Sequence, residues 1–132
     1  QMAVQAAAWD VTAEWTDKVL ELDPGYPQAL YFNGLANYYL SRFDQGEKSL
    51  ANLYQQGHVD EYPFGLLPLG VMHANQGKIG AAAKEIELYL QSMPSEQVPD
   101  AQRVELEKQL ALWESQGLTE PTQEAQPDSG MP

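Results

Sequence analysis

The sequence predicts an all-α fold in which helical hairpins stack side by side as an α–α superhelix, and two observations support this. Across residues 63–94, apolar and small residues recur at steps of three and four, which is the period of a helix with one apolar face. The period breaks at Gln76-Gly77, a turn signal, and resumes at once. Residues 27–60 show the same pattern at an offset of 36 residues, 27 against 63. A period in this range indicates a repeat of paired helices.

The two stretches match position by position. Their matched residues are Leu30 with Leu66, Gly34 with Gly70, Phe43 with Ile79, Gly46 with Ala82, Leu50 with Ile86, and Leu53 with Tyr89. We expect these positions to be buried, and the glycines and alanines among them to let paired helices approach closely. A single hairpin cannot bury both of its faces, so each unit needs a neighbour.

Both units resemble the tetratricopeptide repeat. The second unit has residues of that pattern at the family's spacings, namely Leu66, Leu69-Gly70, Ile79, Ala82, Ile86 and Pro94. Tyr89 stands where the pattern has a small residue. The first unit departs further, because Asn33 replaces the leucine before Gly34, and Gly46 and Leu53 replace alanines.

The resemblance covers residues 9–94 and implies one right-handed domain at residues 1–118. Its parts would be a half repeat at 3–24, repeats at 27–60 and 63–96, and a capping helix at 99–116. Such repeats end a longer and often exported chain in the bacterial proteins that this one resembles. A bacterial source is therefore expected, and an extracytoplasmic location is weakly favoured over a cytoplasmic one.

The first helix is expected at residues 3–22, with an apolar stripe of Val4, Ala8, Val11, Trp15, Val19 and Leu22. The end of this helix resembles the close of a repeat unit. Only the second helix of a hairpin would then be present, and we expect one apolar edge of it to lack a cover.

Four helices should follow, at residues 27–41, 44–56, 63–75 and 79–92. Pro68 lies inside the third of these, which predicts either a kink or a late helix start. Residues 95–98 are expected to form a loop.

The last helix is expected at residues 99–116, with Leu106, Leu110 and Trp113 on its apolar side and Val104 and Leu112 widening that face. A helix that is apolar on one side and polar on the other can cap the end of a repeat array. Residues 119–132 contain no large aliphatic or aromatic residue except Met131, so we expect disorder there.

The composition narrows the classes of partner. Seven Lys and Arg against 19 Asp and Glu give a net charge of −12, which disfavours nucleic acid and anionic membrane surfaces. The chain has no cysteine, and no apolar run approaches the ~20 residues of a membrane span. Basic protein partners are compatible with this charge, and simple solubility is the alternative explanation.

The resemblance implies a concave groove that is lined by the first helix of each pair. The positions left over from the core are Gln28, Tyr31, Leu35, Tyr38 and Tyr39 in one unit, and Phe64, Leu67, Val71, Ala74 and Asn75 in the next. This apolar and aromatic set predicts a groove for a peptide or a partner domain. The alternative is that these side chains pack against the first helix, the last helix or a second copy of the chain.

Few residues suggest catalysis or cofactor binding. His58 lies in a link without ligands at helical spacing, and His73 is expected in the groove or the core. Glu85 and Glu47 are expected to be solvated surface charges. We predict no catalytic, cofactor or metal site, and a non-enzymatic interaction scaffold. Two alternatives are a homodimer formed through the uncovered edge of the first helix, and a regulatory appendage of a larger protein.

Overall fold

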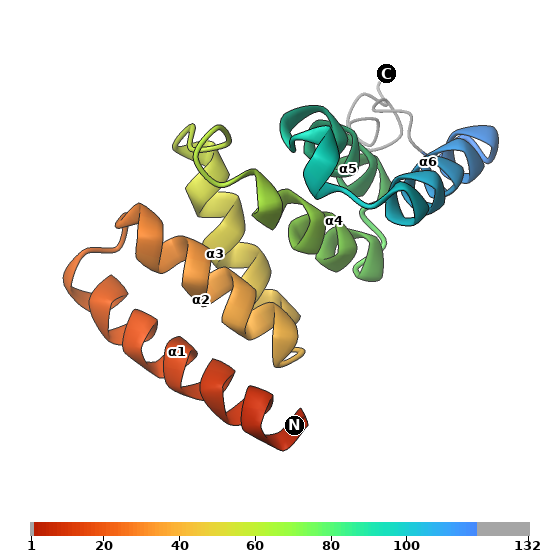
Figure 1. Cartoon of the computed structure of the whole chain (residues 1–132). Helices are drawn as coiled ribbons and strands as arrows, with labels where there is room; N and C mark the ends of the chain where they lie inside the picture. Colours follow the sequence, from red (N-terminus) through yellow and green to blue (C-terminus); the bar gives the residue numbers. More distant parts are fainter. Residues whose placement is uncertain (1, 119–132) are drawn as a thin grey trace.

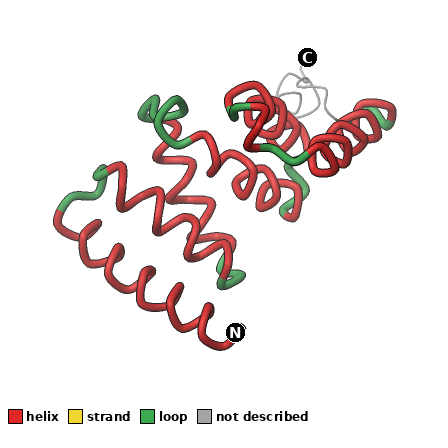
Figure 2. Tube along the Cα trace, viewed as in Figure 1, coloured by secondary structure: helices red, strands yellow, loops and turns green. Residues whose placement is uncertain are grey.

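The fold is all-α, as predicted. A computed structural model describes residues 2–118, which contain six α-helices, two short 3₁₀ turns and no strand (Figures 1 and 2). The predicted disorder of residues 119–132 lies outside the described part. The helices are α1 (Met2–Leu22), α2 (Pro27–Tyr39), α3 (Phe43–Gln55), α4 (Leu66–Asn75), α5 (Ile79–Ser92) and α6 (Asp100–Ser115), and the turns are η1 (Pro63–Gly65) and η2 (Ser95–Gln97).

Consecutive helices pack on one another in chain order. The hairpins α2–α3 and α4–α5 form the centre, and α3 packs on α4 to join them. Helix α1 packs on α2 at one end of the array, and α6 packs on α5 at the other end (Figure 1). The order of the helices along the array therefore follows their order in the sequence.

Helix α4 begins late, which is one of the two outcomes expected for Pro68. A 3₁₀ turn occupies Pro63–Gly65, and the α-helix then starts at Leu66. Pro68 is thus the third residue of α4, where the missing N–H would have had no partner within the helix. The expected loop after α5 contains a second 3₁₀ turn, Ser95–Gln97.

Equivalent glycines lie at a close helix–helix contact in both hairpins. A Cβ added to Gly34 would lie 2.4 Å from Leu50 Cγ, and one added to Gly70 would lie 3.0 Å from Ile86 Cγ1. The two contacts are related by the 36-residue offset of the sequence, since Leu50 matches Ile86. The absence of a side chain at these positions is what lets α2 approach α3 and α4 approach α5.

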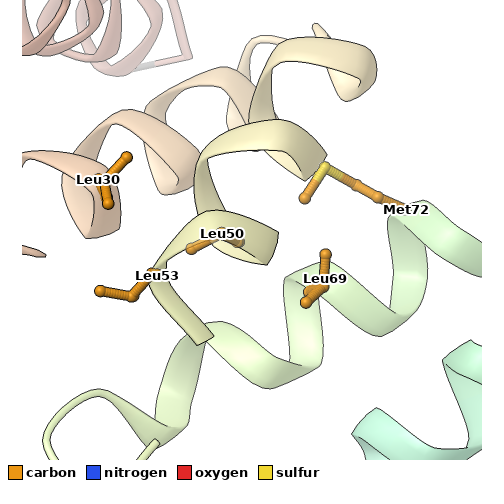
Figure 3. Close-up of a cluster of buried hydrophobic side chains, with 5 residues drawn as sticks. All are labelled: Leu30, Leu50, Leu53, Leu69 and Met72. Atoms are coloured by element: carbon orange, nitrogen blue, oxygen red, sulfur yellow. The ribbon is translucent and has the colours of Figure 1, made fainter. Parts of the chain in front are cut away.

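The main apolar core lies where the two hairpins meet. Its fully buried members come from α2, α3 and α4, and are Leu30, Leu50, Leu53, Leu69 and Met72 (Figure 3). A second cluster, Leu66, Tyr89 and Val98, joins α4, α5 and the segment that leads into α6. Most of the matched positions are buried, although Phe43 and Ile79 are only partly so.

Much of the apolar stripe predicted for α1 faces away from the core. Among its members, Val11, Trp15 and Leu22 are 53%, 66% and 89% exposed. Helix α1 instead packs on α2 through the opposite side, where Ala13 is buried and Trp9 stacks on Tyr39 with ring centroids 4.8 Å apart. The expected uncovered edge of α1 is therefore its main apolar stripe.

The buried side chain of Asn33 on α2 holds α1 in place through hydrogen bonds. Its Nδ2 donates to Thr16 Oγ1 at 2.8 Å and to Asp17 Oδ1 at 2.9 Å, both on α1. Its Oδ1 accepts from Ser49 Oγ on α3 at 2.6 Å and from Asn37 Nδ2 on α2 at 3.1 Å. Asn33 is buried, so these bonds satisfy an amide that would otherwise be costly to enclose.

Candidate functional site

The predicted groove residues on α2 contact aromatic rings of the chain itself. Tyr31 lies against Tyr62, with ring centroids 4.8 Å apart, and Tyr38 stacks on Phe43 at 5.8 Å. Tyr39 stacks on Trp9 of α1 but keeps part of its surface exposed. Only the contact of Tyr39 with α1 matches the alternative given above, because Tyr62 lies in the link after α3 and Phe43 is the first residue of α3.

Leu35 requires a correction. It is only 6% exposed, so it belongs to the buried side of α2 and cannot line an open groove. The residues around it, from Asn33 to Asn37, are all buried as well. Helix α2 is enclosed by α1 on one side and α3 on the other, which leaves little of it free at this level.

The predicted groove residues on α4 are more accessible. Val71 and Ala74 line a pocket of about 340 Å³ between α4 and α6. Its remaining walls are Ile86, Glu105, Leu106, Gln109 and Trp113. Nearby, Phe64 and Leu67 are partly buried against the Leu66–Tyr89–Val98 cluster, and Asn75 is exposed. The α2 residues of the predicted groove do not line this pocket.

A second feature of the structure is a buried histidine held by two carboxylates. His73 on α4 places Nδ1 2.7 Å from Glu85 Oε1 on α5, and Nε2 3.1 Å from Glu47 Oε2 on α3. Carboxylate oxygens only accept, so both bonds form when His73 is the doubly protonated imidazolium. The three residues also line a hollow of about 350 Å³ together with Ala51, Tyr54, Gln55 and Leu69.

In the trio of His73, Glu47 and Glu85, the surroundings of His73 and of Glu85 favour the protonated form of each side chain. The hydrogen bond to Glu85 raises the pKa of His73 above its ordinary value of 6.5, although burial opposes this, and Glu47 adds to the rise. Burial raises the pKa of Glu85 above 4.5, and outweighs the lowering effect of His73. Both shifts mean that the folded chain holds protons at this junction more tightly than free side chains would.

The prediction that Glu85 and Glu47 are solvated surface charges is wrong. Their side chains retain only 18% and 24% exposure, and each makes an ion pair with His73. The sequence signal for this was weak, because the three residues lie on three different helices. No spacing rule within a single helix brings them together.

The second histidine is also paired with a carboxylate. His58 pairs with Glu61 in the exposed link between the hairpins. Within residues 2–118, no group of three or more His, Asp or Glu side chains could hold a metal ion. In the same span, no helix is long and apolar enough to cross a membrane.

No protein-family model matches this chain, and no curated protein or solved structure matches it either. What its surfaces can bind therefore has to be inferred from their own geometry. The pocket between α4 and α6 is the strongest part of the predicted groove, because it combines apolar walls with two polar side chains.

Proposed function

We propose that this chain is a non-enzymatic, tetratricopeptide-type interaction module that binds a peptide or partner domain. The 36-residue offset, repeated in the packing of Gly34 on Leu50 and of Gly70 on Ile86, supports the repeat assignment. The proposed binding face runs along α4 and α6. It comprises Phe64 of η1 and Leu67, Val71 and Asn75 of α4 from the predicted groove, with Leu106 and Trp113 of α6.

The observation that carries this proposal is the apolar pocket between α4 and α6. Its volume of about 340 Å³ suits one or two side chains of a peptide, and its walls include Val71, Leu106 and Trp113. Glu105 and Gln109 also line it, and they can hydrogen-bond a peptide backbone beside the anchor. An apolar anchor next to a few polar groups is the usual anatomy of a peptide-binding site.

A catalytic role is not supported by the histidine trio. Both ring nitrogens of His73 are engaged by carboxylates, so neither is available to take a proton from a substrate. His73 is also buried, and its partners come from the two helices on either side of α4. This arrangement is suited to joining α3, α4 and α5.

The proposal can be tested by selecting peptides from a random library displayed on phage. We expect selected peptides to share an apolar or aromatic anchor and to lose binding to a Val71→Arg variant, in which a charged side chain enters the pocket. Val104 is 48% exposed on α6 and does not line the pocket, so Val104→Arg is the matched control. Peptides that bind Val71→Arg as well as the parent would overturn the assignment of this pocket.

A further inference from the structure

The outer face of α1 is an uncovered apolar ridge. Val11, Trp15 and Leu22 lie along it at steps of four and seven residues and are more than half exposed. From Val11 to Leu22 the ridge extends over roughly 16 Å at 1.5 Å per residue. No other helix of residues 2–118 covers this side, because α1 is the outermost of these helices at its end of the array (Figure 1). Large exposed apolar residues gathered on one helix face mark an interaction site.

One flank of the ridge is acidic. A hollow of about 440 Å³ runs beside it, lined by Ala7, Asp10, Val11, Glu14, Asp17 and Arg42. Arg42 pairs with Asp10 at 3.0 Å and offsets that charge. Asp17 accepts a bond from the neutral amide of Asn33, so its charge is not offset there. Glu14 and Glu21 are exposed on the same flank, which leaves this side negative.

The other flank is apolar. A smaller hollow of about 200 Å³ lies between α1 and the start of α2, and it is lined by Thr16, Val19, Tyr26, Gln28, Ala29 and Phe32. Lys18, the single basic residue of α1, lies at the edge of the acidic flank, four residues after Glu14 and three before Glu21, and its Nζ lies 5.9 Å from the centroid of the Trp15 ring. The Trp15 ring thus already has a cation over its face, a contact that aromatic rings favour.

We propose that the outer face of α1 binds an amphipathic helix of a partner protein with one basic flank. The apolar stripe of that helix would cover Val11, Trp15 and Leu22 and extend into the hollow beside Val19. Its Lys and Arg side chains would face the acidic flank of Glu14, Asp17 and Glu21. This surface is separate from the pocket between α4 and α6, and the inference does not depend on that pocket.

Charge decides against a second copy of the chain as the occupant. If two α1 helices paired antiparallel about a two-fold axis, the same flank of each would meet, and the carboxylates of one copy would lie beside those of the other. If they paired parallel, the acidic flank of each would meet the apolar flank of the other. The carboxylates would then lose their water without gaining a charged partner. Both arrangements also bring together two chains with a net charge of −12. A partner helix with a basic flank avoids these costs, because its Lys and Arg side chains are attracted to the carboxylates of α1.

The experiment uses designed peptides of about 18 residues, which is about five helical turns. The probe has a leucine stripe at helical spacing and lysines along one flank. The matched control has the same stripe with glutamates in place of the lysines. Binding is measured by titration calorimetry, and the contact face is mapped by NMR amide shifts. We expect the lysine peptide to bind at least ~tenfold more tightly than the glutamate peptide, and salt above ~0.1 M to weaken it.

Variants of the chain locate the contact. Trp15→Ser and Leu22→Ser should each weaken the lysine peptide by ~tenfold or more, because central apolar anchors carry most of the binding free energy. Both side chains are mostly exposed, so the variants should keep the parent's circular dichroism and melting temperature. A Glu14→Gln, Glu21→Gln double variant should bind more weakly and with less salt dependence. Val104→Ser on α6 should bind the peptide as the parent does.

Four results would overturn the proposal. In the first, the lysine and glutamate peptides bind equally, so that charge has no part in recognition, and in the second neither peptide binds. Binding of the lysine peptide could survive both Trp15→Ser and Leu22→Ser, which would place the contact elsewhere. Light scattering could show a dimer that Trp15→Ser dissociates, and the occupant would then be a second copy of the chain.

Discussion

Ser41 and Gly77 occupy equivalent turns 36 residues apart, and both have a left-handed backbone, with φ of 62° and 83°. Each follows the first helix of its hairpin. Glycine adopts this conformation without strain, whereas Ser41 is the one residue other than glycine in residues 2–118 that does so. The second hairpin therefore has the better turn residue at this position.

Ser41→Gly should stabilise the chain. A left-handed backbone costs a residue with a Cβ roughly 1–2 kcal/mol, and glycine loses ~0.5–1 kcal/mol more entropy on folding. The net gain in the free energy of unfolding is then about 0.5–1 kcal/mol, measured by urea denaturation. The reciprocal Gly77→Ser should lose a similar amount. A Ser41→Gly variant less stable than the parent would show that the serine side chain has a role of its own.

Gly34→Ala should destabilise the chain despite the higher helix propensity of alanine. The new Cβ would lie 2.4 Å from Leu50 Cγ, which is fully buried and cannot move aside freely. Overpacking of this kind costs roughly 1–3 kcal/mol, against ~1 kcal/mol gained from propensity. Gly70→Leu should be more severe still, because a full leucine side chain would meet Ile86. Thermal melts followed by circular dichroism measure both.

Gly25→Ala is the control for these glycine variants. Its Cβ would come 3.3 Å from Nε2 of Gln56, the far end of a flexible side chain that can shift. We expect a change in melting temperature close to zero. If Gly34→Ala melted at the same temperature as Gly25→Ala, the close approach of α2 and α3 would not depend on the glycine.

The stability of the α3–α4–α5 junction should fall as the pH rises through the pKa of His73. That pKa is raised above 6.5 in the folded chain, so the folded state binds this proton more tightly than the unfolded state does. The stabilisation is fully present below pH 6.5 and is lost above the raised value. Glu85 has the same sign, because its pKa is raised above 4.5. The measurement is a series of urea denaturations from about pH 6 to about pH 9.

His73→Gln should remove the part of this pH dependence that lies above pH 6.5. At about pH 6 it should also cost about 1.5–3 kcal/mol, because two poorly exposed carboxylates lose a charged partner. His58→Gln is the matched control, since His58 pairs with Glu61 in an exposed link. It should keep the parent's pH dependence. If the free energy of unfolding changed with pH in the same way in the parent and in His73→Gln, the role assigned to the trio would be refuted.

Asn33→Leu should destabilise the chain even though it restores the leucine of the repeat pattern. The change leaves Ser49 Oγ and the α1 groups that Asn33 binds without their partner, at a cost of about 1–3 kcal/mol for the buried groups. Helix α1 should be the element most affected. Limited chymotrypsin digestion should then cut faster near Trp15 in the variant than in the parent, and an unchanged digestion rate would contradict this.

The helical hairpins could be predicted from sequence because they depend on local periodicity. Leu30, Gly34 and Leu50 recur at Leu66, Gly70 and Ile86, and such spacing indicates which side of each helix is buried. The side of α1 that meets α2 could not be found in this way. Besides Trp9 and Leu20, its contacts are made by Ala13, Thr16 and the amide of Asn33 on α2, which are too small or too polar to be recognised as a core face.

The candidate sites were less predictable than the fold. Val71 is accessible, but its pocket needs Leu106 and Trp113 from α6, and sequence spacing does not show how α6 is placed against α4. Leu35 was misassigned because an assignment one position off turns a helical residue by about 100°. The His73 trio joins residues from three helices, and only the folded chain brings them together.

Asn33 and His73 each tie three consecutive helices together, and the two sets share α3. Asn33 joins α1, α2 and α3 through Ser49, and His73 joins α3, α4 and α5 through Glu47. In an array with nearest-neighbour contacts alone, helices can open one at a time from an end. Here, releasing α3 breaks both polar links at once, so α1 to α5 should open as one cooperative unit. Helix α6, which has no buried residue, should exchange its amide hydrogens before the rest.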